Sequence, residues 1–131
     1  MVKPAETGGK MKPSKKQPKY KNKKVTIDGV TYDSLREYHR FCELKRLERA
    51  GEISNLQRQV KYILVPSQKL NGKVVERSVS YAADFVYHDK SGNLIVEDSK
   101  GYRNPASAGY AKFVIKRKLM LYVHGIQIKE V

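Results

Sequence analysis

Residues 94–100, with the sequence LIVEDSK, place charged side chains at the end of an apolar strand. Successive side chains of a strand point to opposite faces, so Asp98 and Lys100 share one face and Glu97 lies on the other. An acid two residues before a lysine is common in so basic a chain, and only the position at the end of an apolar strand sets this pair apart. A carboxylate and an ammonium group at one place suit chemistry at a phosphate, where the cation neutralises developing charge.

A second acid, Asp84, lies within the apolar sequence YAADFVY. A carboxylate in such surroundings must be paired, hydrogen-bonded or bound to a cation. If its strand pairs as a hairpin across residues 88–93, Asp84 comes near residues 96–98. Crowded carboxylates repel one another until a hard cation lies between them, and Mg²⁺ is the usual cation at such sites. The alternative is a salt bridge from Asp84 to Lys100 without catalysis.

A third acid, Glu37, precedes Leu44 by seven residues, which is nearly two turns of a helix. It therefore shares the apolar stripe of that helix and faces the sheet. The alternative is a first-turn carboxylate that only favours the helix dipole. Taken together, the three acids and Lys100 predict metal-assisted attack on a phosphodiester, in which the lysine orients water or neutralises charge.

The elements that position these residues follow from periodicity and turn signals. A hairpin is predicted over residues 25–32 around Asp28-Gly29, a dipeptide typical of type I′ turns. A helix then begins after Asp33 or Ser34 and ends at Gly51. The remaining elements, in order, are strands at 58–65, 73–87 (after a loop with Asn71-Gly72) and 94–100, a helix at about 109–124 ended by Gly125, and a strand at 126–128. The helices carry apolar stripes of Leu35, Tyr38, Phe41, Cys42, Leu44 and Leu47, and of Tyr110, Phe113, Val114, Met120 and Leu121.

The positive charge is unevenly distributed along the chain. Of the net charge of +14 over 131 residues, the first 24 residues contribute +8, from nine lysines and one acid. Their Pro, Gly, Ser and Lys content predicts a disordered basic arm over residues 1–24, followed by one domain over residues 25–131. The arm is either a solubilising tail or a segment that binds nucleic acid backbone, and its candidate phosphate contacts include Lys15, Lys16, Lys23 and Lys24.

Composition excludes several classes of protein. The longest apolar run, residues 119–123, is far shorter than the roughly 20 residues that span a bilayer. The basic start continues without an apolar region, so we expect no secretory signal and a cytoplasmic location. The single cysteine, Cys42, forms neither an internal disulfide nor a zinc site and is expected to be a small core residue.

The ordered set of motifs resembles the PD-(D/E)XK nuclease superfamily, and within it a family of small bacteriophage and prophage endonucleases. The resemblance covers residues 25–131. It rests on YDSLREYHRFCELKRLERAGEIS at 32–54, Gln59, ADFVY at 83–87, VEDSKG at 96–101, and residues 116–121. Two positions depart from the usual pattern, because Asp98 stands where Glu is more frequent and Ala83 replaces the usual Pro. Glu97 leaves the motif's register ambiguous, and strand alternation favours Asp98.

The resemblance implies an α/β fold with a restriction-endonuclease-like core of a helix, three strands, a helix and a strand. It implies that Glu37, Asp84 and Asp98 hold one or two Mg²⁺ ions, with Mn²⁺ as a substitute and the Ser99 carbonyl as a further ligand. Lys100 would position or activate the attacking water, and Gln59 would orient water or phosphate. The products would carry 5′-phosphate and 3′-hydroxyl ends.

Small phage enzymes of this kind resemble Holliday-junction resolving enzymes, which implies a homodimer acting on branched DNA in the cytoplasm of a bacterial host. A two-fold dimer suits a four-way junction. Basic residues around the second helix are expected to meet backbone phosphates, unless they are only a solvated face: Arg103, Lys112, Lys116, Arg117 and Lys118. Two alternatives remain: a nicking or transposon-end nuclease that works with a partner, and a noncatalytic basic protein that binds nucleic acid.

Overall fold

The computed structural model describes residues 23–100 and 103–131. Most of the predicted basic arm, including Lys15 and Lys16, lies outside the described residues. The chain divides into two compact units, one that ends at Leu35 and one that comprises Arg36–Val131.

The described part of the first unit is a hairpin of β1 (Val25–Ile27) and β2 (Val30–Tyr32). Asp28 and Gly29 form its turn with φ of 52° and 78°. Two consecutive positive φ values are the mark of a type I′ turn, so the predicted hairpin and turn type are both confirmed.

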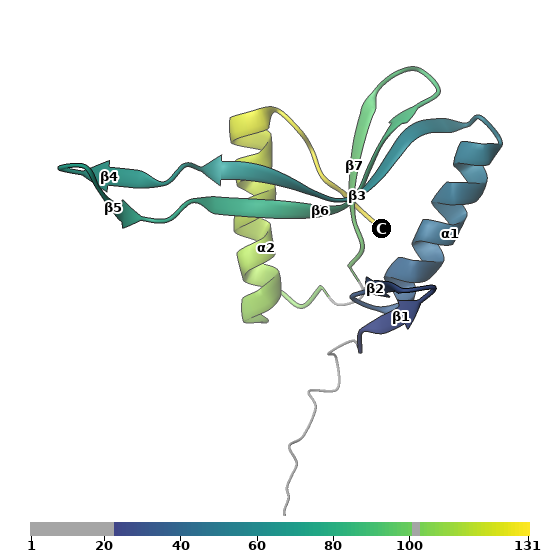
Figure 1. Cartoon of the computed structure of the whole chain (residues 1–131), viewed down its shortest axis with the longest axis horizontal. Helices are drawn as coiled ribbons and strands as arrows, with labels where there is room; N and C mark the ends of the chain where they lie inside the picture. Colours follow the sequence, from purple (N-terminus) through teal and green to yellow (C-terminus); the bar gives the residue numbers. More distant parts are fainter. Residues whose placement is uncertain (1–22, 101–102) are drawn as a thin grey trace, which may run out of the picture. The chain divides into compact units, whose positions relative to one another are not determined.

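The second unit contains a four-stranded sheet with the strand order β3-β6-β7-β8. Figure 1 labels the first three of these strands. β3 and β7 each run antiparallel to β6, and β8 runs parallel to β7. A separate two-stranded ribbon consists of β4 and β5. The fold is thus mixed α/β, with a mostly antiparallel sheet and two helices. Its elements are α1 (Leu35–Arg49), β3 (Ile53–Val65), β4 (Gln68–Leu70), β5 (Lys73–Glu76), β6 (Val79–Asp89), β7 (Leu94–Asp98), α2 (Ala108–Leu119), the π-helical turn η1 (Met120–His124) and β8 (Lys129–Glu130).

The two helices cover opposite faces of this sheet. On β6, Phe85 packs in one apolar cluster with Leu44 of α1, and the next residue, Val86, packs in another with Phe113 of α2. Neighbouring side chains of a strand point to opposite faces, which places one helix on each side. None of the helices in the described part of the chain has the length and apolar character needed to cross a membrane.

Several predicted strands differ in extent from the observed ones. The strand predicted at 58–65 begins at Ile53, and the one predicted at 73–87 is divided into β5 and β6 by exposed residues between them. The strand predicted at 126–128 is wrong, because pairing with β7 starts at Lys129. Ile128 is buried in the core, so its apolar character reflects packing rather than strand pairing.

The predicted helical stripes are correct at their centres and wrong at their ends. Leu44 and Phe113 are buried, whereas Leu47 is 39% and Leu121 is 54% exposed. Leu121 leaves the stripe because the last turn of the second helix is π-helical, and a wider turn rotates the following side chains away from the 3.6-residue pattern. Leu35, at the start of α1, is also exposed.

Candidate active site

The two central strands bring two of the predicted acids together. β6 pairs with β7 in the hairpin expected across residues 88–93, with Phe85 opposite Glu97. The next position along this register places Asp84 opposite Asp98. The backbone N–H of Ser99 donates a hydrogen bond of 2.8 Å to Asp84 Oδ2, so the end of β7 contacts the Asp84 carboxylate directly.

Glu37 of α1 joins this pair from another element. Its side chain is 2% exposed, and one of its carboxylate oxygens lies within 4.8 Å of one from Asp84. The side-chain amide of Gln59 bridges the two acids, donating to Glu37 Oε2 at 2.9 Å and to Asp84 Oδ1 at 3.3 Å. Arg58 Nη2 lies 3.4 Å from the same Glu37 oxygen. Glu37 therefore faces the sheet, as the helical stripe predicted.

Gln59 reaches both acids because its backbone is left-handed, with φ of 53°. In a regular strand Arg58 and Gln59 would point to opposite faces, yet both contact Glu37. The alternation of side chains is also broken on β6. Ala83 packs in the apolar cluster with Phe113 of α2, and Phe85, two residues later, packs in the cluster with Leu44 of α1. A non-glycine residue in this conformation carries a cost of about 1–3 kcal/mol, and such residues gather at functional sites.

Asp98 lies on the side of the sheet that carries α2. The hydroxyl of Tyr81 donates to Asp98 Oδ1 at 2.8 Å, and Lys100 Nζ lies 2.9 Å from Asp98 Oδ2. Lys100 also sits over the ring of Phe113 at 4.0 Å. Asp98 and Lys100 share a face as predicted, and Lys100 pairs with Asp98 instead of forming the alternative salt bridge with Asp84.

The arrangement leaves negative charge incompletely compensated. The pKa of Asp84 is raised to about 7, first by burial and then by the charges of Asp98 and Glu37, against hydrogen bonds from Ser99 and Gln59. Asp98 Oδ2 is buried, and its contact there is the ion pair with Lys100 Nζ at 2.9 Å. A bound divalent cation would relieve the repulsion around Asp84, and an oxygen-only donor set of this kind suits Mg²⁺ or Mn²⁺.

Glu97 points to the opposite face and serves a different purpose. It is fully buried, and Arg40 of α1 donates to it through Nε at 2.9 Å and through Nη2 at 2.6 Å. The Tyr87 hydroxyl donates a hydrogen bond to the same carboxylate. The Glu97 contact raises the pKa of Arg40, and burial followed by the Glu97 contact raises the pKa of Tyr87. Glu97 is thus committed to a cluster with Arg40 and Tyr87, which leaves Asp98 as the acid beside Asp84.

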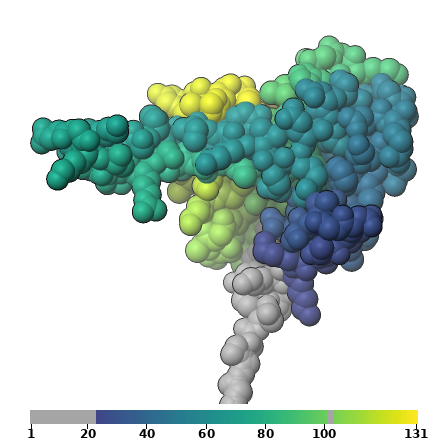
Figure 2. Space-filling view, viewed as in Figure 1, coloured from purple at the N-terminus to yellow at the C-terminus, as the bar shows by residue number. Residues whose placement is uncertain are grey.

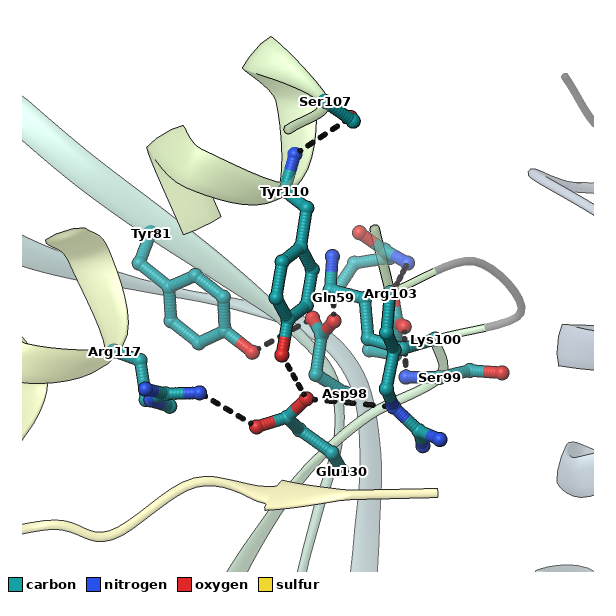
Figure 3. A network of polar contacts seen from close by, with 11 residues as sticks. Gln59, Tyr81, Asp98, Ser99, Lys100, Arg103, Ser107, Tyr110, Arg117 and Glu130 are labelled. Carbon is teal, nitrogen blue, oxygen red and sulfur yellow. Dashed lines mark hydrogen bonds and ion pairs between the residues drawn. The ribbon is translucent and has the colours of Figure 1, made fainter. Parts of the chain in front are cut away.

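The residues predicted to contact DNA fall into two groups. Arg117 lies 3.0 Å and Arg103 3.5 Å from the carboxylate of Glu130, which also accepts a hydrogen bond from Tyr110 (Figure 3). Those two arginines are therefore engaged within the protein. Of the other predicted contacts in the described residues, Lys112, Lys118 and Lys23 are exposed, Lys116 is half-buried, and Lys24 pairs with Asp33 at 2.8 Å.

Sequence reasoning missed several contributors to this region. Tyr81 reads as an ordinary core residue of an apolar strand, and only the pairing of β6 with β7 brings its hydroxyl to Asp98. Glu130 follows a predicted strand near the end of the chain without any motif. Its role depends on β8 pairing beside Asp98, and Figure 3 shows its carboxylate among Tyr110, Arg117 and Arg103.

Comparison with known proteins returned one family. A family model described as "Protein of unknown function (DUF1064)" matches residues 17–127. Neither the curated proteins nor the solved structures contain a match.

The Glu97 cluster predicts a large loss of stability when its cation is removed. Arg40→Met leaves the carboxylate buried without its counter-charge, and we expect the free energy of unfolding to fall by about 3–5 kcal/mol in urea denaturation. Arg46→Met, an exposed position on the same helix, should change it by less than about 0.5 kcal/mol. In the double variant with Glu97→Gln, part of the loss should be recovered, and equal losses in single and double variants would contradict a buried ion pair.

The raised pKa of Asp84 predicts a pH dependence of stability in metal-free protein. The folded protein favours the protonated form of Asp84, so ionisation of this acid lowers the free energy of unfolding. The loss is absent below about pH 4, the pKa of an unfolded aspartate, and is complete above about pH 7, where the acid is ionised in both states. Asp84→Asn should match wild type near pH 4 and be more stable at pH 8 by on the order of 2–4 kcal/mol. The measurement is urea denaturation of both proteins in EDTA across this range, and a constant difference would contradict the assigned cause.

Proposed function

We propose that this protein, which belongs to the DUF1064 family of unknown function, is a metal-dependent endodeoxyribonuclease with a core of the PD-(D/E)XK type. The observation that carries the proposal is the position of Asp84 between two other acids. One of its carboxylate oxygens lies within 4.8 Å of one from Glu37, and the charge of Asp98 raises its pKa. Gln59 contacts Glu37, and Lys100 contacts Asp98. A protein that only bound phosphate would gain nothing from two buried acids beside a half-buried one. In a chain of net charge +14, acids so placed are best explained by a cation that they hold.

The proposed division of roles follows from the contacts. Glu37, Asp84 and Asp98 would hold Mg²⁺, with the Ser99 carbonyl as a further ligand, and the bound ion would polarise the phosphate and lower the pKa of water. Lys100, held beside Asp98, would supply the positive charge that orients the attacking water or neutralises charge on the phosphate. Gln59 keeps Glu37 and Asp84 at a fixed separation through two hydrogen bonds from one amide.

Fold order and charge support the assignment to DNA. The second unit contains α1, the sheet strands β3, β6 and β7, then α2 and β8, an order that the resemblance implies, with the β4–β5 ribbon inserted between β3 and β6. The exposed lysines of α2 offer phosphate contacts without base readout. We take branched DNA as the preferred substrate and a homodimer as the acting form, on the basis of the resemblance to junction-resolving enzymes.

Cleavage should depend on the acids and on Lys100. With Mg²⁺, purified wild type is expected to cut a four-way junction, a flap or a plain duplex in a gel assay, with the junction cut fastest. Asp84→Asn, Asp98→Asn and Lys100→Ala should each reduce cleavage by at least 100-fold. DNA binding by the Asp variants should be retained or tightened, because a carboxylate that repels phosphate is removed.

Glu52→Gln and Lys90→Ala are the matched controls, since these residues form an exposed ion pair at 3.3 Å and carry the same charges. Both controls should cleave like wild type. If wild type cuts none of the three substrates with Mg²⁺ or Mn²⁺ but binds them all, the noncatalytic nucleic-acid-binding protein replaces the nuclease.

Metal binding should be linked to the proton on Asp84. Because the pKa of this acid is about 7 without metal, Mg²⁺ must displace a proton at pH 6 and does so far less at pH 8. The rise in Tm with MgCl₂ should therefore be larger at pH 8 than at pH 6. Calorimetric titration in two buffers should show proton release at pH 6, and Asp84→Asn should abolish it while Glu52→Gln leaves it unchanged.

A further inference from the structure

The β4–β5 hairpin, residues 66–79, extends from β3 and β6 and adds nothing to the core. Every residue of this hairpin is exposed, and β4 pairs only with β5 among the described strands. Figure 2 shows it projecting past the elements that pack around the sheet. A two-stranded ribbon alone is marginally stable in water, so contact with a partner would stabilise it.

The hairpin is nevertheless built as a defined ribbon. Its turn residues Asn71 and Gly72 have φ of 52° and 79°, which is again the type I′ pattern. This turn matches the twist of the flanking strands and sets the register. The ribbon continues into β6, the strand that carries Asp84.

The surface of the hairpin mixes charge and apolar groups on both faces. Lys69 lies opposite Val74, and Leu70 lies opposite Lys73, so each face presents a lysine beside an apolar side chain. With Arg77 and Glu76, the hairpin has a net charge of +2, from three bases and one acid. A surface for self-association would gather its apolar residues on one face, because lysine is unfavourable in the core of an interface. Lysines on both faces instead suit a partner with negative charge on both sides.

We propose that the β4–β5 hairpin enters a groove of duplex DNA beside the site of cleavage. The inference rests on the proposed function only in taking DNA as the ligand. The major groove of B-DNA admits a two-stranded β-ribbon, with phosphates along both edges and thymine methyl groups on its floor. Lys69, Lys73 and Arg77 would meet the phosphates, and Leu70 and Val74 the groove interior.

Reach along the chain is consistent with this arrangement. At roughly 3.3 Å per residue, the chain from Asp84 to the turn at Gly72 extends up to roughly 40 Å. This is close to one helical turn of B-DNA, about 34–36 Å. The hairpin would therefore contact the duplex about one turn from the phosphate at the active site, and would hold that duplex in place.

The test is equilibrium binding in EDTA, where no cleavage occurs, by fluorescence anisotropy with a labelled 30-base-pair duplex and a four-way junction. The charge variant is Lys69→Ser/Lys73→Ser/Arg77→Ser, and the apolar variant is Leu70→Ser/Val74→Ser. The control removes three exposed bases elsewhere, Arg46→Ser/Arg49→Ser/Lys90→Ser. Because all substituted positions are exposed, each variant should keep the Tm of wild type to within a few degrees, which verifies folding.

The charge variant should bind the 30-base-pair duplex roughly tenfold or more weakly at 150 mM NaCl, and its log–log salt slope should fall by about two to three. The apolar variant should weaken binding about threefold to tenfold with an unchanged slope. The control should lose less than threefold. Wild type and charge variant should bind a 10-base-pair duplex about equally, because it is too short to reach both the site and the hairpin.

The proposal would be overturned if the charge variant and the apolar variant bound the 30-base-pair duplex with the same affinity as the control variant. It would also be overturned by sedimentation data in which the hairpin variants become monomers while affinity per protomer is unchanged, because the hairpin would then bind a second copy of the chain. If wild type binds duplex through the hairpin but cuts no DNA, the proposed nuclease fails and the hairpin inference stands. If wild type cuts DNA but the hairpin variants bind DNA as tightly as wild type does, only the hairpin inference fails.

Discussion

The buried carboxylate of Glu97 connects α1 to β7 and thereby sets the geometry around it. Arg40 binds it through two nitrogens, and an ion pair of this kind holds its partners only when both charges remain in place. Glu37 lies one helical turn before Arg40, and Asp98 follows Glu97 on the strand. The position of Glu37 relative to Asp98 therefore depends on the Arg40–Glu97 ion pair, which lies on the face of β7 opposite Asp98.

A second constraint is the repulsion between the acids themselves. Burial and the neighbouring charges raise the pKa of Asp84 to about 7, so near neutral pH the site without metal is poised between protonated and ionised forms. Gln59 holds two of the carboxylates through one amide, at the cost of a left-handed backbone in the middle of a strand. Backbone strain at Gln59 and charge repulsion at Asp84 thus occur at neighbouring residues, and both features gather at functional sites.

Much of the fold could be predicted from local signals. The turn at Asp28-Gly29, the helix ending at Gly125 and the hairpin that brings Asp84 beside Asp98 all follow from turn chemistry and strand alternation. The prediction failed where packing competes with pairing, as at Ile128, which is apolar because it is in the core and not because it lies in a strand. It also failed at Leu121, because a π-helical turn has no signature in apolar spacing.

The sequence by itself determined which acids are available and on which side of their strand they lie, because alternation and helical spacing are local properties of the backbone. Strand alternation in this way distinguishes Asp98 from Glu97. Only the tertiary structure decided which partners those acids have: Tyr81 and Lys100 for Asp98, Gln59 and Ser99 for Asp84, and Arg40 for Glu97. These contacts join residues that are distant along the chain, and they depend on strand order, on the twist at Gln59 and on the packing of α1, none of which is encoded in a short stretch of residues.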